Sequence, residues 1–348
     1  MVMRAVAIAA LLASACGTFE EPSIVLDLRV IAMRTDIGSN SPTQADQVID
    51  VDLTKEPQVG DLLAQLRTTS VTAWVADPGT SRRLVWSMTL CLPGDEGRCD
   101  FSRPHIEFGA GEIDDPDTST SYQRPYAEIL PGDSQMGTTI VAMLLREIQD
   151  NPVNALGGVD LIVQLQIGGA DEPRANDIFA VKKLRIAPRI PVERAPNTNP
   201  SITGIETAVN GFAAVDNFRS AGGQSIRCSD PSYQRLGGKA EVRQGDVVTI
   251  FPNEAHDTRE DYAIPGLDGS TIILEEAISY QWLATYGGWS DETTGGGHDI
   301  LGNQSLLGSD WTAPYLGGRD FLDVSIWMIQ RDERFGVTPV ETCITVVP

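Results

Sequence analysis

A serine and three histidines are the side chains of this sequence that could support hydrolysis. Ser134 follows Asp133 in a Gly-Asp-Ser sequence and could act as a nucleophile if a histidine served as its base. The expected partner would be an Asp-x-x-His near the C-terminus, but neither His256 nor His298 has an aspartate three places before it. The sequence also lacks metalloprotease, P-loop and G-x-S-x-G motifs. We therefore interpret residues 131–133 as a turn and keep a hydrolase with an unrecognised site as an alternative.

Acidic side chains in a long polar stretch, residues 109–124, could bind calcium, which prefers carboxylate and carbonyl oxygens. They are Asp114, Asp115 and Asp117. An EF-hand loop starting at Asp115 would need a glycine and a glutamate where the sequence has Thr120 and Tyr126. We expect a solvated acidic loop and no cofactor, with calcium as the alternative. A second candidate metal site comprises Glu254, His256, Asp257, Glu260 and Asp261.

Aromatic side chains in the second half of the chain could stack on sugar rings, because Tyr and Trp combine an apolar face with a polar group. Trp289 lies in a Gly-Gly-Trp-Ser-Asp stretch that favours a turn, so we expect it to be accessible to a ligand. Tyr286 and Trp311 are further candidates for such a site. Trp282 and Trp327 fit strand patterns, and we expect both in a hydrophobic core.

The first sixteen residues, MVMRAVAIAALLASAC, have the layout of a secretory signal, with a basic start, an apolar run and small residues before Cys16. The apolar run is about half of the roughly 20 residues that span a bilayer, so a retained transmembrane helix is not expected. The sequence LASAC, residues 12–16, resembles the lipobox of bacterial lipoproteins. That resemblance implies cleavage before Cys16 and a lipid anchor on this cysteine.

Four cysteines remain after the predicted cleavage point, and they are Cys91, Cys99, Cys228 and Cys343. An even number in an exported chain is typical of disulfides. Of the three possible pairings we favour Cys91–Cys99 and Cys228–Cys343, because each bond then lies within one proposed domain. A zinc site would need closely paired C-x₂-C cysteines, and the sequence has none.

The charge of the chain limits its partners. The formal net charge is −22, with 48 acidic and 26 basic residues. Nucleic acid is therefore not expected as a partner, because phosphate binding requires clustered lysines and arginines. Docking on anionic lipid is disfavoured for the same reason, whereas a solvated protein outside the cytoplasm is favoured.

The elements that would position these residues are mainly strands. Apolar residues alternate with polar ones or form short runs, separated by Gly, Pro, Asn and Asp clusters. The predicted strands cover residues 24–30, 49–53, 84–90, 161–167, 184–186, 247–251, 278–282, 322–328 and 340–347. This pattern predicts a mainly β chain of antiparallel sandwiches.

One segment departs from the strand pattern. Residues 138–149 have Ile140, Met143, Leu144 and Ile148 at helical spacing, which predicts one helix inserted in the first of two sandwich domains. A segment with four prolines then predicts a semi-rigid linker. The expected division is a signal peptide at 1–15, a first β-sandwich-like domain at 16–187, the Pro-rich linker at 188–200 and a second β-sandwich domain at 201–348.

The second domain carries a further resemblance. Residues 278–290, ISYQWLATYGGWS, the sequence WTAP at 311–314, and VSIWMIQRDERFGV at 324–337 resemble bacterial Ig-like and PKD-type sandwich modules. The resemblance implies an Ig-like architecture for this domain. The Cys and Trp spacing of true Ig domains is not met, so the resemblance concerns architecture alone.

Together these features predict a membrane-tethered lipoprotein of the cell envelope with a structural or protein-interaction role and no catalysis. Gly17, rather than an aspartate, follows the acylated cysteine and favours the outer membrane. The expected partners are the membrane, through the lipid, and an envelope protein or a polysaccharide. A polysaccharide-binding surface module is an alternative function.

Overall fold

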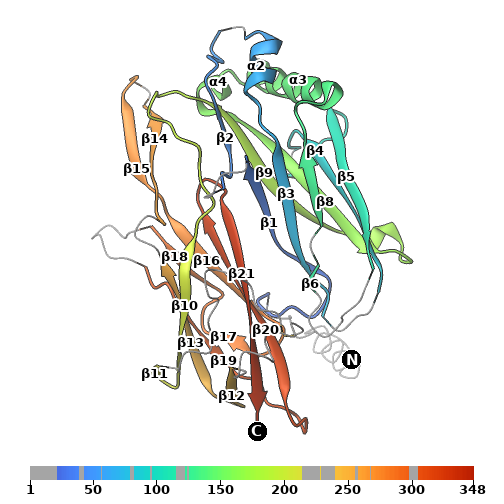
Figure 1. Cartoon of the computed structure of the whole chain (residues 1–348), viewed down its shortest axis with the longest axis vertical. Coiled ribbons are helices and arrows are strands. Elements are labelled where there is room, and N and C mark those ends of the chain that lie inside the picture. Colours follow the sequence, from blue (N-terminus) through green and yellow to red (C-terminus); the bar gives the residue numbers. More distant parts are fainter. Residues whose placement is uncertain are drawn as a thin grey trace, which may run out of the picture.

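The computed structural model describes residues 22–38, 43–55, 57–78, 82–94, 96–114, 122–123, 125–213, 228, 240–254, 258–266, 268–297 and 305–348. The chain is mainly β with few helices, and it forms two packed sandwiches, so the predicted fold class is confirmed. Strands up to residue 188 build the first sandwich and strands from residue 202 build the second (Figure 1).

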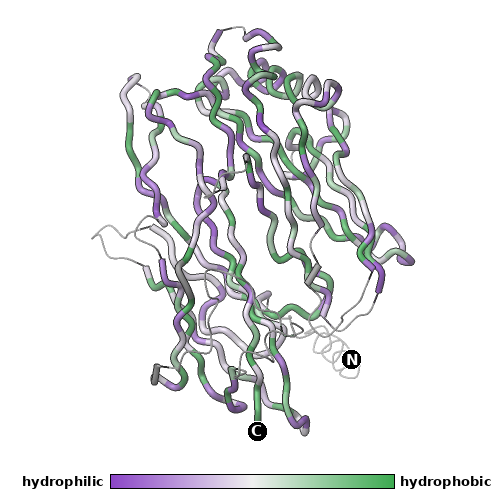
Figure 2. The backbone as a smooth tube through the Cα atoms, in the orientation of Figure 1, coloured by the Kyte–Doolittle hydropathy of each residue, from purple (hydrophilic) through white to green (hydrophobic). Residues whose placement is uncertain are grey.

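Two sheets form the first sandwich. One contains β1 (Arg29–Ile37), β3 (Thr69–Ala76), β6 (Tyr122–Gln123) and β7 (Tyr126–Ile129). The other has the order β2 (Gln47–Ile49), β9 (Ile178–Pro188), β8 (Val159–Gly169), β4 (Leu84–Cys91) and β5 (His105–Ile113). Alternating side chains such as Leu161, Val163 and Leu165 are fully buried in its core. Figure 2 shows the resulting alternation of hydrophobic and hydrophilic residues along the strands.

Helices cover one end of this sandwich (Figure 1). They are α2 (Val59–Gln65), α3 (Ser134–Asp150) and α4 (Asn154–Gly157). The helix predicted at 138–149 is α3, and it buries Ile140, Met143 and Leu144 as expected. It begins earlier because the Asp133 carboxylate accepts hydrogen bonds from the N–H groups of Gln135 and Met136, as an N-cap does. None of the helices described is long and apolar enough to cross a membrane.

Two five-stranded sheets form the second sandwich. The first has the order β11 (Phe212–Ala213), β10 (Ile202–Val209), β13 (Val247–Glu254), β19 (Ser309–Thr312) and β17 (Gly288–Trp289). The second has the order β12 (Glu241–Arg243), β21 (Val337–Val347), β20 (Leu322–Asp332), β16 (Ile278–Ala284) and β18 (Thr293–Gly296). Trp282 and Trp311 are fully buried between these sheets, where each ring removes a large apolar surface from water.

A separate hairpin of β14 (Asp261–Pro265) and β15 (Thr271–Glu275) leaves the second sandwich. It rises beside the first sandwich, and β14 contacts α4 at the upper end (Figure 1). The hairpin therefore belongs to the second half of the chain by sequence, but it lies along the first half in space.

Both proposed disulfides are present. Cys91 pairs with Cys99, and Cys228 pairs with Cys343, with Cα–Cα distances of 5.5 and 5.0 Å. The first closes the loop after β4, and the second ties residue 228 to the buried strand β21. Each bond lies within one sandwich, as the sequence analysis expected.

Several sequence-based boundaries need correction. Residues 24–30 do not form one strand, because Ile24 pairs with Ala284 of the second sandwich and β1 begins only at Arg29. The segment changes sheets between these points, so Val25 and Ile31 are buried while Leu26 is exposed. Residues 109–113, expected in a polar loop, form the end of β5 and pair with β4.

The segment at 188–200 is not an open spacer. Asn197, Asn199 and Pro200 are buried, and only its middle, around Val192, is well exposed. An apolar cluster also joins the sandwiches, packing Ile31 and Trp74 of the first against Trp327 and Ile329 of the second. The two sandwiches therefore share a buried junction, which the sequence analysis did not expect.

Candidate functional site

A tight turn of the second sandwich inserts into the first at this junction. The turn joins β20 to β21, and its Phe335 has a left-handed φ of 79°. The buried Lys182 of β9 donates a hydrogen bond from Nζ to the carbonyl oxygen of Phe335. Lys183 and Arg185 place their charges over the Phe335 ring, at 5.0 and 5.1 Å from its centroid. Cation–π contacts and a desolvated hydrogen bond thus fix the turn on β9.

The last residues of the linker complete the contact through their side chains. The Asn197 Nδ2 donates to both carboxylate oxygens of Asp332, each at 3.2 Å, and to the Arg334 carbonyl oxygen. Asn199 Nδ2 donates to the Thr35 carbonyl oxygen at 2.8 Å, and its Oδ1 accepts from the N–H of Val337 at 3.0 Å. These amides satisfy backbone and carboxylate groups of both sandwiches at once.

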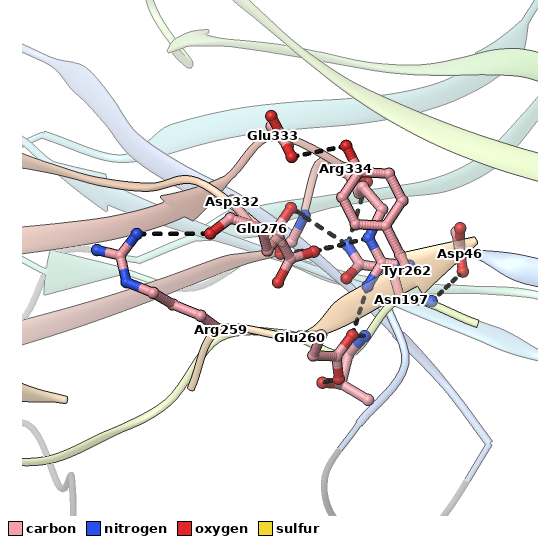
Figure 3. A network of polar contacts seen from close by, with 11 residues as sticks. Asp46, Asn197, Arg259, Glu260, Tyr262, Glu276, Asp332, Glu333 and Arg334 are labelled. Atoms are coloured by element: carbon pink, nitrogen blue, oxygen red, sulfur yellow. Dashed lines mark hydrogen bonds and ion pairs between the residues drawn. The ribbon is translucent and has the colours of Figure 1, made fainter. Parts of the chain in front are cut away.

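Arg334 is the centre of a charged network at this junction (Figure 3). Its Nε lies 2.7 Å from Glu276 Oε1 and its Nη2 lies 2.5 Å from Glu260 Oε2. Its guanidinium also lies 4.7 Å from the centroid of the Tyr262 ring. Burial and the nearby Asp332 raise the pKa of Glu276 to about 7, although Arg334 opposes the shift.

Asp46 faces the same network from the first sandwich. It is buried, and its Oδ1 accepts a hydrogen bond of 2.6 Å from the Asn197 N–H. Burial raises the pKa of Asp46 to about 6, and this hydrogen bond and the arginines nearby only partly offset the effect. Asp46 therefore titrates near pH 6, where an exposed aspartate is already ionised.

A pocket of about 250 Å³ opens between the two sandwiches, and we call it the junction pocket. Its polar lining comprises Asp46, Arg185, Arg194, Tyr262, Glu333 and Arg334. The Tyr262 hydroxyl donates a hydrogen bond of 2.7 Å to Glu333 Oε1. Three arginines thus meet around one small cavity in a chain of net charge −22. The junction pocket therefore brings six ionisable side chains together around one cavity.

The second notable surface is the outer edge of the hairpin. The Gly266 N–H donates to the Ser270 carbonyl oxygen, and the Glu276 N–H donates to the Glu260 carbonyl oxygen. Because hydrogen-bonded pairs alternate with non-hydrogen-bonded pairs in an antiparallel ladder, Ile272 and Leu274 bond to β14. The backbone groups of Ile273, between them, therefore point away from β14. Among the described residues, β15 pairs with β14 alone.

The aromatic residues proposed for sugar binding differ in how far they are exposed to solvent. Trp311 is fully buried, and its Nε1 donates to the Tyr286 carbonyl oxygen, so its ring offers no face to a ligand. Trp289 is only partly exposed, because it pairs with Trp311 in the sheet and its ring packs 5.3 Å from that of Trp282. Tyr286 exposes 39% of its surface. These placements correct the expected accessible platform at Trp289.

The proposed calcium and histidine sites fall partly outside the described residues. Asp114 follows β5, whereas Asp115 and Asp117 lie in a part that the structure does not describe, as do Cys16, His256 and His298. Where the chain is described, no three His, Cys, Asp or Glu side chains are grouped as metal ligands. The calcium site stays a prediction.

The junction could not be predicted because its residues look ordinary in sequence. Asn197 and Asn199 stand in a proline-rich stretch, for which a semi-rigid linker is the usual interpretation. The side-chain amides of Asn197 and Asn199 could have indicated a packed junction. Each amide both donates and accepts hydrogen bonds, which a solvent-exposed linker does not require. Arg334 and Phe335 lie in the segment 324–337, whose sequence carries no signal of their contacts with the first sandwich.

Comparisons with known proteins identify no family. No family model matches the chain, and no curated protein matches it either. Among solved structures, red sea bream transglutaminase aligns at 8% identity over 92% of this chain and 32% of that chain, with a TM-score of 0.20. Dimeric latent PorU from Porphyromonas gingivalis aligns at 11% identity over 92% of this chain and 20% of its own, also with a TM-score of 0.20. This chain thus spans about a third and a fifth of those proteins, and neither likeness carries an argument about function.

Proposed function

We propose that this chain is a lipid-tethered protein of the bacterial cell envelope, and that its role is to hold another envelope protein by strand addition at β15. The tether is supported by the lipobox-like LASAC sequence at residues 12–16. The interaction role is supported by the open edge of β15. We place the protein at the outer membrane, because Gly17 follows Cys16.

The exposure of β15 is the observation that carries the interaction role. Ile272, Ile273 and Leu274 expose 41%, 56% and 38% of their surfaces, although they are consecutive aliphatic residues of one strand. Unprotected apolar edges invite pairing with another chain, and proteins usually blunt them with charges, prolines or bulges. This strand carries none of these devices over the three residues, so its edge is suited to receive a partner strand.

The charge of the hairpin indicates what kind of strand would bind. Its strand ends carry Asp261 and Glu275, both exposed, and the whole chain has a net charge of −22. A second copy of this chain would bring the same charges to the edge and be repelled. The expected occupant is therefore an extended segment of another envelope protein, with aliphatic residues at its centre and lysine or arginine at its ends.

Photo-crosslinking in cells tests the strand addition. A photoreactive residue at Leu274 should give one discrete adduct of higher mass, whereas the same residue at the exposed Val153 should give none. Ile273→Pro should abolish the adduct because it removes an outward N–H without breaking a bond to β14. Ile273→Val keeps that N–H and should retain the adduct. Equal adducts from both variants, or an adduct of two copies of this chain, would contradict the proposal.

Membrane fractionation tests the tether separately. Cys16→Ser should move the protein from the membrane fraction to the soluble fraction, because the acylated residue is lost. Cys91→Ser with Cys99→Ser removes a disulfide instead and should leave the protein with the membranes. Membrane association of the Cys16→Ser protein would overturn the anchor without bearing on the strand edge.

A further inference from the structure

Arg194 differs from the other arginines of the junction pocket in its partners. A short turn in the linker holds it, since the Arg194 N–H donates to the Pro191 carbonyl oxygen at 2.9 Å. Its Nη1 donates to the carbonyl oxygens of Leu156 and Pro188, at 2.9 and 3.1 Å. Within the described residues both hydrogen-bond acceptors of its guanidinium are backbone carbonyls and neither is a carboxylate, although the residue is half-buried. Its Nε–H and Nη2 donors are therefore left for another acceptor.

The other two arginines of the pocket are already paired. Arg185 holds Asp160 with two hydrogen bonds of 2.6 and 3.0 Å, and Arg334 holds Glu276 and Glu260. Their charges still act on Arg194. Burial lowers the pKa of Arg194, and repulsion from Arg185 and Arg334 lowers it further, while attraction to Asp46 only partly opposes these effects. The positive charge at Arg194 is thus poorly compensated by the protein.

We propose that the junction pocket binds a small molecule bearing a carboxylate or phosphate group, with Arg194 as its main contact. An oxyanion there would accept the two unused donor groups of Arg194 in the forked geometry that guanidinium provides. It would also relieve the repulsion among the three arginines. The proposal is independent of the lipid tether and of the β15 edge.

The remaining lining residues limit what can bind. Glu333 is exposed at the rim and is bonded to Tyr262, and Asp46 lies deeper, so carboxylates oppose a ligand that carries many negative charges. The volume of about 250 Å³ lies below the usual range of drug-sized sites. These limits favour a compact ligand with one or two negative charges over a polyanion such as nucleic acid.

Isothermal titration of the whole protein at low ionic strength tests the site. The probes are inorganic phosphate, succinate and, as an uncharged match, succinamide. We expect saturable binding of phosphate or succinate and none of succinamide. Binding of phosphate alone would indicate a phosphorylated ligand, and binding of succinate alone would indicate a carboxylate, because the two probes differ in the oxyanion they present.

Variants of adjacent residues separate binding from folding. Arg194→Gln should weaken binding by at least about tenfold, since it removes a charge-assisted pair. Because Arg194 also holds two backbone carbonyls, Ala195→Asp provides a second test: this exposed position lines the pocket, and a new carboxylate there should weaken binding similarly. Ala195→Asn and Arg83→Gln, outside the pocket, should bind as the wild type does.

Two results would overturn the proposal. One is the absence of saturable binding of either anion to the wild-type protein. The other is binding that survives both Arg194→Gln and Ala195→Asp while thermal unfolding shows both variants folded. Loss of binding in Ala195→Asn as well would show that shape at this position, and not charge, controls the pocket, and it would also contradict the proposal.

Discussion

Trp282 and Trp289 show how the environment of a single residue decides its energetic role. Trp282 is fully buried and its Nε1 donates to Thr294 Oγ1 at 2.9 Å. Trp289 packs against it from β17 and is only partly exposed. We expect Trp282→Ala to lower the free energy of unfolding by about 3–5 kcal/mol. Trp289→Ala should cost about 1–3 kcal/mol, because it removes less buried surface and one ring contact.

Chemical denaturation of the two variants measures this difference. Tyr315→Ala is the control, since Tyr315 exposes 83% of its surface and should change stability by less than about 0.5 kcal/mol. A Trp289→Ala protein as stable as this control would show that the ring does not pack against Trp282. A loss equal to that of Trp282→Ala would place Trp289 fully in the core.

The raised pKa of Asp46 predicts that its contribution to the free energy of unfolding falls as pH rises, whereas that of most carboxylates increases. Its pKa is about 6 in the folded protein, above the ordinary 3.8. The folded state therefore holds the proton more tightly, so the stabilisation is complete below about pH 4 and is lost as pH rises through about 6. Asp46→Asn should match the wild type near pH 4 and exceed its stability at pH 8 by on the order of 3 kcal/mol.

Urea denaturation at pH 4, 6 and 8 follows this contribution. Asp171→Asn, at an exposed position, should show no such pH-dependent difference from the wild type. If the difference between Asp46→Asn and the wild type were the same at every pH, Asp46 would not titrate in this range.

At the scale of elements, the partial burial of the linker predicts that limited proteolysis cuts the chain without separating the two sandwiches. The sequence alone predicts cleavage between residues 187 and 200 into two separate fragments, because proline-rich segments pack poorly. In the structure only the middle of this segment is open, with Val192 75% exposed, whereas Asn197 and Asn199 are buried. We expect cleavage near Val192, and we expect the two fragments to elute together in native size-exclusion chromatography. Fragments that separate without denaturant would contradict the shared junction.

The elements that could be predicted from sequence are those set by the pattern of neighbouring residues, and not by contacts between distant parts of the chain. β8 and β20 follow from alternating apolar residues, and α3 follows from helical spacing with a proline after its end. β15 could not be predicted. Its consecutive aliphatic residues do not alternate with polar ones, and in the structure they face solvent, so the sequence does not distinguish this strand from a buried strand or a loop. The junction pocket was also beyond prediction, since Asp46, Arg194 and Arg334 meet only through the docking of two sandwiches.

At the scale of the whole molecule, the junction predicts that both sandwiches unfold together. The apolar cluster around Trp327 and the polar contacts of Asn197 are lost only when the sandwiches separate. Calorimetry should therefore show one transition for the wild type. Asn197→Ala removes the side-chain amide donor of the buried Asp332, which then keeps, among the described residues, only the N–H of Gly336 as an amide donor, and it should lower the melting temperature or split the transition. The exposed Asn176→Ala is the control, and two transitions in the wild type would contradict the prediction.

The pairing of Ile24 with Ala284 has a consequence for the order in which the chain acquires its structure. Ala284 also donates its N–H to the Ser23 carbonyl oxygen, so the first described residues complete an edge that belongs to the second sandwich. During synthesis these residues emerge first, but the strand that receives them emerges near the end. The amino-terminal segment must therefore wait, unpaired, while the rest of the first sandwich assembles. Its closure is a late step that joins residues far apart in the sequence.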